Sequence, residues 1–188
     1  MLRARDTKSS IEDAALRLFV ARGVAETSIR DIAVEARVSL GAMYNHYRSK
    51  EELAWTLFST NFSEMGMELQ RRAKEQDGIQ NQLPSMIEYV FRQFDENWVL
   101  VSYVFLARHQ HLSRVTPDLG NPYTAFRFVI AEAVRRGEVP RQSVELATSM
   151  VTGAIIQTID SRILRRIRSK LAELAEPVSA ACLRLLQS

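Results

Sequence analysis

The stretch that decides the fold is TSIRDIAVEARVSLGAMYNHY, residues 27–47. Its first half repeats apolar residues at the spacing of one buried helical face: Ile29, Ile32, Ala33 and Ala36. Thr27 or Ser28 can cap this helix, because a hydroxyl accepts hydrogen bonds from the free amides of a first turn. The pattern breaks at Arg37, and Ser39 can cap a second helix over residues 40–46. Two short helices joined by a turn of about three to four residues predict a unit that places a helix in the DNA major groove.

The second helix has an unusual composition for a structural helix. Met43 and Tyr47 lie four residues apart and can both face inward. Gly41 costs about 1 kcal/mol against alanine in a helix, but it allows another surface to come close. Tyr44 and Asn45 offer hydrogen-bonding groups one turn later, which suits a groove-reading helix. The alternative is an ordinary amphipathic turn of a helical domain.

Composition and charge favour an all-α chain with its positive charge near the beginning. The 188 residues are 46% hydrophobic and include 7 Gly and 5 Pro, with little β-type alternation. Residues 1–50 hold 9 Lys and Arg against 6 Asp and Glu, whereas residues 51–188 hold 16 of each. This modest surplus supports nucleic-acid binding without establishing it. We expect cytoplasmic localisation and no membrane partner, because there is one cysteine, no long apolar run and no signal-peptide pattern.

Helical patterns predict about nine helices. We expect an N-terminal three-helix helix-turn-helix DNA-binding domain over residues 1–49 and a larger helical effector-binding and dimerisation domain over residues 50–188. The expected helices cover residues 10–22, 27–36, 40–46, 50–76, 81–95, 98–112, 123–136, 141–167 and 170–186. Helix 98–112 is apolar nearly all round, so it is expected at the centre of the second domain. Residues 1–9 are either a frayed terminus or a basic arm, with Arg3, Arg5 and Lys8, that touches phosphates.

The last two expected helices have the character of an interface. One stripe contains Leu171, Leu174, Ala175, Val178, Cys182 and Leu185. The other contains Val144, Ala147, Val151, Ala154, Ile155, Thr158 and Ile159. Doubled across a two-fold axis, two such helices would form a four-helix homodimer interface. The alternative is that both stripes pack only within the chain.

Residues 11–53 resemble the TetR family of transcriptional regulators. The resemblance is carried by Ile-x-x-Ala-Ala-x-x-Leu-Phe19, Gly23, Thr27-Ser-Ile-Arg-Asp-Ile-Ala33, Ala36, Val38-Ser39, Gly41-Ala42-x-Tyr44-x-His-Tyr47 and Ser49-Lys-Glu-Glu-Leu53. It covers about a quarter of the chain. It implies a homodimer that binds a double-stranded DNA operator, is usually a repressor, and responds to a small-molecule effector.

The resemblance also implies roles for individual residues. Tyr44 and Lys50 match phosphate contacts, while Thr27 and Ser39 match caps that also touch the DNA backbone. Arg30 matches a position that sometimes reaches a base. The base-facing side is matched by Leu40, Gly41, Ala42, Asn45 and His46.

No catalytic or metal-binding pattern was found, and no cofactor is expected. His109 and His111 lie about 200° apart on a helix, so one face cannot present both to a metal. Polar-tipped or mobile side chains on otherwise apolar helices are candidates for an effector pocket. They are Phe62, Met65, Tyr89, Phe94, Trp98, Tyr103, Phe105, Arg108, His109, Phe126, Met150 and Gln157. Each alone is also compatible with an ordinary core position. A rival interpretation is a helical small-molecule-binding protein with a vestigial helix-turn-helix.

Overall fold

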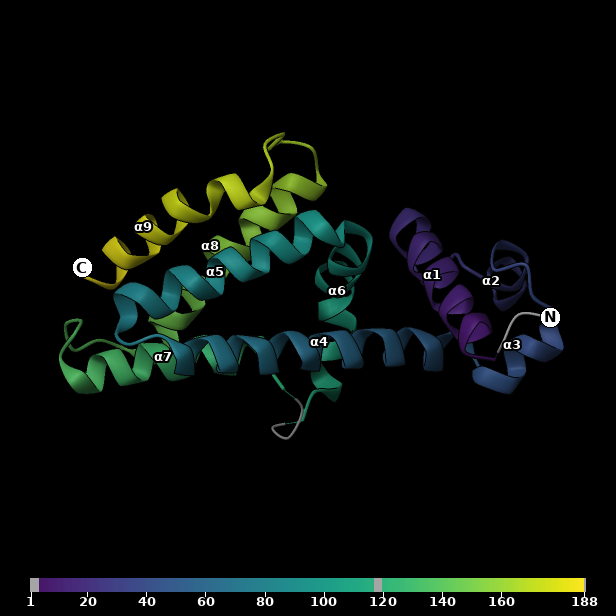
Figure 1. The fold of residues 1–188 in the computed structure, drawn as a ribbon, viewed down its shortest axis with the longest axis horizontal. Helices are drawn as coiled ribbons and strands as arrows, with labels where there is room; N and C mark the ends of the chain where they lie inside the picture. Colours follow the sequence, from purple (N-terminus) through teal and green to yellow (C-terminus); the bar gives the residue numbers. More distant parts are fainter. Residues whose placement is uncertain (1–3, 117–119, 188) are drawn as a thin grey trace. The chain divides into compact units, whose positions relative to one another are not determined.

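The computed structural model describes residues 4–116 and 120–187, and throughout these ranges the secondary structure is helical (Figure 1). Its α-helices are α1 (Ala4–Arg22), α2 (Ile29–Glu35), α3 (Leu40–His46), α4 (Lys50–Glu75), α5 (Ile79–Glu96), α6 (Trp98–His111), α7 (Pro122–Arg136), α8 (Val144–Ile163) and α9 (Ala175–Leu186). There are also two short 3-10 helices: η1 (Leu112–Arg114) follows α6, and η2 (Leu171–Leu174) precedes α9. The predicted all-α fold of about nine helices is confirmed. In the described ranges, no helix has the length and apolar character needed to cross a bilayer.

The chain forms two compact units. Unit 1 contains Met1–Asn61 and Val99–Val115, and unit 2 contains Phe62–Trp98 and Thr116–Ser188. Helix α4 therefore belongs to both units. The division into functional domains at residues 49 and 50 stays a prediction. Nearly all of α6 belongs to unit 1, and its expected place at the centre of the second domain stays a prediction.

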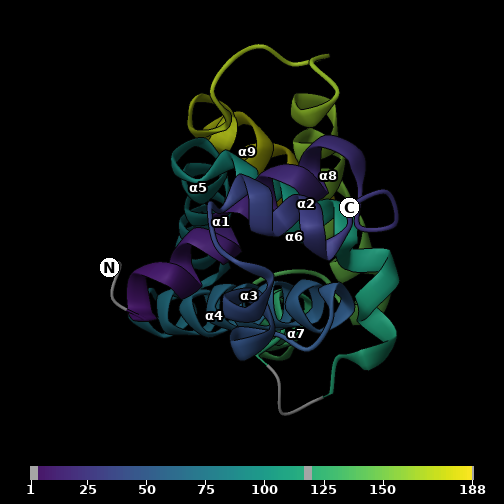
Figure 2. The ribbon, with the colours of Figure 1, turned by 90° about the vertical axis from the view of Figure 1, so that its right-hand side faces the viewer.

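Unit 1 has a small core built where α1, α2 and α3 meet one another (Figure 2). One face of α1 is buried, with Ile11, Ala14 and Phe19 inside. Ile32 of α2 and Met43 of α3 are fully buried as well. Burial of a large apolar side chain such as Ile11, Phe19 or Met43 contributes about 1.5–3 kcal/mol, so this core stabilises the three-helix group.

Helix α6 is fastened to the rest of unit 1 by Tyr103. The buried Tyr103 hydroxyl donates to the Ala54 carbonyl oxygen on α4 at 2.7 Å. Its ring also lies 5.6 Å, centroid to centroid, from the ring of Phe19 on α1. Burial raises the pKa of the Tyr103 phenol. One side chain thus links three helices of this unit.

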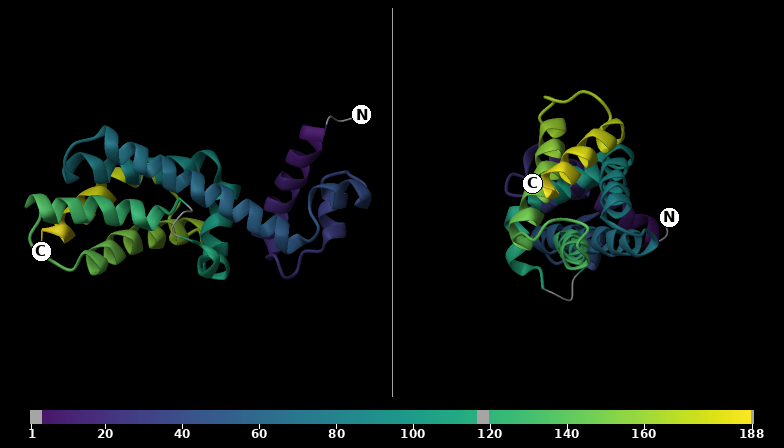
Figure 3. Two further views of the ribbon diagram at one scale, coloured as in Figure 1. Left: turned by 90° about the horizontal axis from the view of Figure 1, so that it is seen from below. Right: turned by 90° about the vertical axis from the view of Figure 1, so that its left-hand side faces the viewer.

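Unit 2 is organised around α5. The amphipathic face of α5 is buried against α9, η2, α7 and α8, and its inward residues are Ile79, Leu83, Met86, Ile87, Val90, Phe91 and Phe94. Helices α8 and α9, yellow-green and yellow in Figure 3, lie next to each other in this unit. Their buried stripes include Val151, Ile155 and Cys182. Much of the pattern predicted as a dimer interface therefore packs within the chain.

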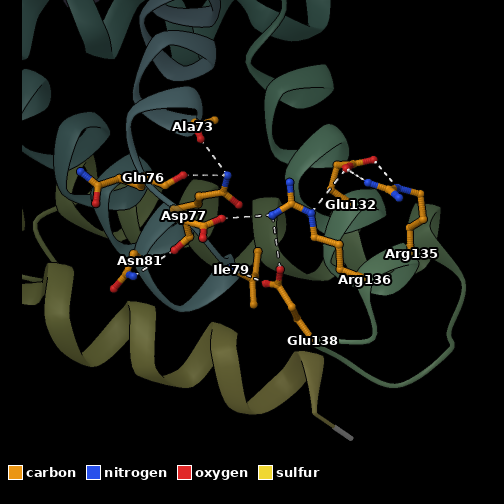
Figure 4. Close-up of polar contacts among 10 residues, drawn as sticks. Ala73, Gln76, Asp77, Ile79, Asn81, Glu132, Arg135, Arg136 and Glu138 are labelled. Atoms are coloured by element: carbon orange, nitrogen blue, oxygen red, sulfur yellow. Dashed lines mark hydrogen bonds and ion pairs between the residues drawn. The ribbon is translucent and has the colours of Figure 1, made fainter.

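The beginning of α5 is capped by a residue from a distant loop (Figure 4). Gly78 has φ +74° and supplies no side-chain cap. Instead, a Glu138 carboxylate oxygen accepts from the Ile79 amide at 2.7 Å. Arg136 binds Asp77 at 3.1 Å and lies 3.7 Å from Glu138. This polar cluster joins the α4–α5 turn to the α7–α8 loop.

Some helix boundaries differ from the predicted ones, because the local sequence pattern does not reveal every residue that begins or ends a helix. Helix α1 begins at Ala4 rather than near residue 10, and a Lys8–Glu12 ion pair at 3.7 Å supports its early turns. Helix α8 ends at Ile163 rather than near residue 167, because Arg165 adopts φ +57°. The expected last helix is split into η2 and α9. Asp95 of α5 accepts from the amide of Leu171 and, at 2.8 Å, from the amide of Ala172.

Candidate nucleic-acid interface

Helix α2 is held in place by a reciprocal cap. The Ser28 hydroxyl oxygen accepts from the Asp31 amide at 3.1 Å, and the Asp31 carboxylate accepts from the Ser28 amide at 2.9 Å. Ser28, not Thr27, is therefore the cap. The hydrogen bonds from Ser28, together with nearby Arg22, lower the pKa of Asp31. Ion pairs Arg22–Asp31 at 2.9 Å and Arg17–Glu35 at 3.1 Å fasten α2 to α1 and neutralise two of its carboxylates.

Helix α3 has the predicted bounds and the predicted cap. The Ser39 hydroxyl oxygen accepts from the Ala42 amide at 3.1 Å. Met43 and Tyr47 face inward, as expected. The Tyr47 hydroxyl donates to Glu12 of α1 at 2.5 Å, and burial together with this bond raises the pKa of the Tyr47 phenol. The inward face of α3 is thus fixed on α1 at both a packed and a hydrogen-bonded contact.

The outward face of α3 carries the residues expected to meet DNA. Leu40, Gly41, Tyr44 and Asn45 are exposed, with 53% of Tyr44 accessible, and Ala42 and His46 are half-buried. Arg30 is exposed on α2. Thr27 is the member of the expected DNA-contact set that is buried. Only 1% of it is accessible, and its hydroxyl donates to the Gly23 carbonyl oxygen at 2.8 Å, so its side chain is a structural anchor in this unit.

A hollow of about 450 Å³ lies between the start of α2, the side of α3 and the start of α4. Its lining residues are Ala25, Glu26, Thr27, Ser28, Ile29, Tyr44, Arg48, Ser49, Lys50 and Glu51. The Lys50 ammonium donates to the Ala25 carbonyl oxygen at 2.9 Å, which holds this cation at the hollow. An ammonium has three donors, so Lys50 retains the capacity to bind an anion there.

The start of α4 is capped by Ser49. Its hydroxyl oxygen accepts from the Glu52 amide at 3.1 Å. The Glu52 carboxylate accepts from the Arg48 amide at 2.8 Å, one residue earlier than the expected capping-box partner. This arrangement fixes the backbone on both sides of Lys50. Arg3 of the expected basic arm lies outside the described residues, as does the side chain of Arg5.

The residues expected to form one effector pocket fall into different environments. Phe62, Met65, Phe94 and Phe126 are buried in unit 2, and Tyr89 is half-buried there beneath the Arg72 guanidinium. Tyr103, Phe105, Arg108 and His109 belong to unit 1, where Arg108 donates to the Phe105 carbonyl oxygen of its own helix. The two sets belong to different units, and the expected pocket stays a prediction.

Four members of the expected pocket are exposed, and their part in binding an effector stays a prediction. They are Trp98, His109, Met150 and Gln157. Met150 and Gln157 lie on the outer face of α8, because Val151 and Ile155 take the inner face. Among the histidines of α6 it is His111 that is buried, since it follows Tyr103 and Ala107 at four-residue spacing on the packed face. In the parts of the chain that the structure describes, no group of acidic, histidine or cysteine side chains could hold a metal ion.

Sequence reasoning missed an aromatic cluster in unit 1. The ring of His111 lies 5.7 Å from that of Trp55 and 4.9 Å from that of Phe58, both on α4. The Arg114 guanidinium lies 3.9 Å from the centre of the Trp55 ring. Trp55 and Phe58 are three residues apart on a helix, and that spacing was the available signal.

Comparison with known proteins bears on this surface. Residues 11–55 match the model for bacterial regulatory proteins of the tetR family. MftR of Mycobacterium tuberculosis, named as a mycofactocin biosynthesis transcriptional regulator, is 30% identical over 71% of this chain and 67% of its own length. The chain belongs to the TetR family. TtgR, an HTH-type transcriptional regulator of Pseudomonas putida, is 28% identical over 86% of this chain and 80% of that protein. AcrR of Shigella flexneri is 40% identical, but that match covers only 37% of this chain and 34% of AcrR.

Solved structures give the same fold across nearly the whole chain. The fatty acid degradation regulator FadR from Bacillus halodurans has a TM-score of 0.83, 18% identity and coverage of 94% of both chains. FadR from Bacillus subtilis, solved in complex with stearoyl-CoA, has a TM-score of 0.76, 20% identity and coverage of 93% of this chain and 97% of that one. The relatives of this TetR-family chain are named as transcriptional regulators, which is a non-enzyme class.

Proposed function

We propose that this TetR-family protein is a ligand-responsive repressor that binds a palindromic DNA operator as a homodimer and is released by a small-molecule effector. The observation that carries the proposal is the outward face of α3. It presents small and hydrogen-bonding side chains beside a hollow that holds Lys50, while its inward face is fixed on α1. A rigid helix with an accessible face is what major-groove reading requires.

The proposed DNA contacts divide into positioning and reading. Tyr44 and Lys50 bind phosphates from the hollow, and Ser39 touches the backbone at the start of α3. Leu40 and Ala42 offer apolar contacts to thymine methyl groups. Asn45 and His46 supply the hydrogen bonds to base edges, and Arg30 reaches from α2. Gly41 allows the close approach.

An exposed apolar stripe on α8 supports the homodimer. Leu146, Met150 and Leu164 are all exposed, and Gly153 and Gln157 lie between them on the same face. Between α8 and α9 runs an apolar groove of about 510 Å³, lined by residues that include Ala154, Thr158, Val178, Ala181 and Leu185. Apolar surface of this extent on a protein marks an interaction site. We place the two-fold contact on this outer face of α8 and α9.

Release by an effector rests on the continuity of α4. This helix begins at the Lys50 hollow and continues into unit 2, so a shift of α4 moves the DNA-contacting residues. A dimer must hold its two recognition helices about 34–36 Å apart to reach successive major grooves. An effector that binds the form with the wrong separation more tightly lowers the DNA affinity. The stearoyl-CoA complex of FadR supports ligand binding in a protein of this fold.

Gel-shift titrations at several salt concentrations test the phosphate contacts. Lys50→Ala and Tyr44→Phe should weaken binding to all duplexes alike, and Lys50→Ala should lower the salt slope by about one. Lys74→Ala is the matched control, because Lys74 is an exposed lysine in the last turn of the same helix. Equal affinities and slopes for Lys50→Ala and Lys74→Ala would contradict the proposed role.

The rival function is a helical small-molecule-binding protein whose helix-turn-helix no longer reads DNA. The first turn of α3 favours it, since Leu40, Gly41 and Ala42 carry no polar side-chain group. Selection from random genomic fragments separates the two functions. Enrichment of an inverted repeat supports the regulator, and the absence of any enrichment supports the rival.

A further inference from the structure

His111 is a buried histidine at the end of α6 in unit 1. Only 8% of it is accessible, and its ring is enclosed by Trp55 and Phe58 of α4. Burial, together with the nearby Arg114 guanidinium, lowers the pKa of His111. The imidazole is therefore neutral near pH 7.

The Nε2 atom of His111 has no hydrogen-bond partner among the described residues. Native proteins satisfy almost all buried polar atoms, because a buried donor or acceptor that has lost water and gained nothing is costly. Phenylalanine would fill the same volume without that cost. An unpaired nitrogen among aromatic rings can therefore take a partner that the described residues do not supply.

The surroundings of His111 define the chemistry of that partner. Trp55 is half-buried and presents a ring face that is now covered by the exposed Arg114 side chain. Arg114 ends a 3-10 helix of three residues, so its guanidinium can leave the indole without the loss of an α-helical turn. The freed indole face suits an aromatic ring. A neutral imidazole suits an uncharged hydroxyl, which can both donate and accept and so fits either tautomer.

We propose that Trp55 and His111 bind a neutral phenolic compound, whose ring stacks on the indole in place of Arg114 and whose hydroxyl bonds to His111 Nε2. This inference rests on the proposed effector-responsive function and names the ligand class for it. Trp55 lies five residues after Lys50, or about 7.5 Å along the helix at 1.5 Å per residue. Ligand binding here acts on the part of α4 next to the proposed phosphate contact.

Tryptophan fluorescence offers a direct test. The chain has two tryptophans, so Trp98→Phe leaves Trp55 as the only reporter. This protein is titrated with resorcinol, toluene and benzoate. Resorcinol should change the Trp55 emission saturably and bind at least about tenfold more tightly than toluene or benzoate, which is the effect of one hydrogen bond in an apolar site. Absence of a saturable change with resorcinol, or equal or tighter binding of toluene or benzoate, would overturn the proposal.

Two substitutions assign the effect to Nε2. In the same background, His111→Phe should weaken resorcinol about tenfold and leave toluene unchanged. His111→Gln, which keeps a hydrogen-bonding side chain, should retain the preference for resorcinol and serves as the test if His111→Phe does not fold by circular dichroism. His109→Phe is the control, because His109 is the exposed histidine of the same helix. A His111→Phe protein that binds resorcinol as tightly as the parent, or a His109→Phe protein weakened as much as His111→Phe, overturns the assignment. If His111→Phe does not fold, loss of the resorcinol preference in His111→Gln overturns it.

Failure of this inference can be separated from failure of the proposed function. Gel shifts without any ligand report DNA binding alone. Intact DNA binding with no phenol binding removes only the ligand assignment. Phenol binding at His111 with no DNA binding removes the regulatory function and leaves this site in place.

Discussion

Gly41 lies in α3 at a position where neither backbone geometry nor packing requires glycine. It has helical backbone geometry and lies on the exposed face. A Cβ added there would meet only the Ser39 hydroxyl oxygen, at 3.9 Å. Packing within the chain therefore does not explain this residue. The proposed close approach of α3 to DNA would explain it.

Gly41→Ala should separate stability from binding. The substitution removes the helix cost of glycine and should raise the free energy of unfolding by about 0.5–1 kcal/mol, measured by urea denaturation. At the same time the added methyl group should lower the affinity for operator DNA in gel shifts. A more stable protein with unchanged DNA affinity would show that the first turn of α3 does not approach the duplex.

The DNA-contact set shows what residue patterns reveal and what they miss. Periodicity identified Met43 and Tyr47 as inward and so left the outward face of α3 for contacts. It could not distinguish Thr27 from Ser28 as the cap, because both hydroxyls are at suitable positions. The deciding fact is a hydrogen bond from Thr27 back to Gly23, which depends on the path of the chain before α2.

At the scale of elements, the backbone of α4 in unit 2 makes a close contact with the backbone of the segment before α7. A Cβ on Gly66 would lie 2.5 Å from the Asn121 nitrogen and 2.6 Å from the Gly120 carbonyl carbon. A Cβ on Gly120 would lie 2.5 Å from the Ser63 carbonyl oxygen. Neither neighbour is a flexible side chain. These two glycines therefore set how closely α4 and the segment before α7 approach.

Gly66→Ala should act in the direction opposite to Gly41→Ala. Both are helical glycines, but at Gly66 the methyl group must push backbone apart, so the substitution should lower the free energy of unfolding by about 1–3 kcal/mol. Urea denaturation of both variants beside the parent protein measures the contrast. A Gly66→Ala protein as stable as Gly41→Ala would contradict the close contact.

Helix bounds were predictable where the cap is local and unpredictable where it is distant. Helices α3 and α4 begin where Ser39 and Ser49 cap them, and a serine before an apolar pattern is visible in sequence. The early start of α5 depends on Glu138, and η2 depends on Asp95. Those partners are 59 and 76 or more residues away along the chain, and no local pattern indicates them.

For the whole molecule, the proposed dimer depends on which face of α8 is exposed. Seven of the thirteen residues in the stripes predicted for the interface are buried within the chain, because an apolar stripe on a helix does not reveal whether its cover belongs to the same chain. Others, such as Ala154 and Leu185, line the groove of the proposed interface. The exposed stripe through Leu146, Met150 and Leu164 became recognisable only once the inner face was assigned. The placement of the effector residues stays a prediction for the same reason.

Met150→Arg should convert the dimer to a monomer. Met150 is 45% accessible on the proposed interface, where an unpaired charge cannot be buried without cost. Analytical ultracentrifugation at micromolar concentration should show the monomer, and the operator affinity should fall by about a hundredfold or more, because paired half-sites are lost. Met67→Arg is the control, since Met67 is 54% accessible on α4. A dimeric Met150→Arg protein would require a different interface.

The central claim is that two copies of α3 read DNA from one dimer. Selection of bound duplexes from a random pool, followed by sequencing, tests it most directly. The expected product is an inverted repeat whose half-site centres lie about 10–10.5 base pairs, or 34–36 Å, apart. Lys50→Ala should recover the same repeat with a lower yield of bound duplex, because it weakens binding to all duplexes alike, and Lys74→Ala should match the parent protein. A pool with no enriched sequence, or with single half-sites lacking a fixed partner, would contradict the account.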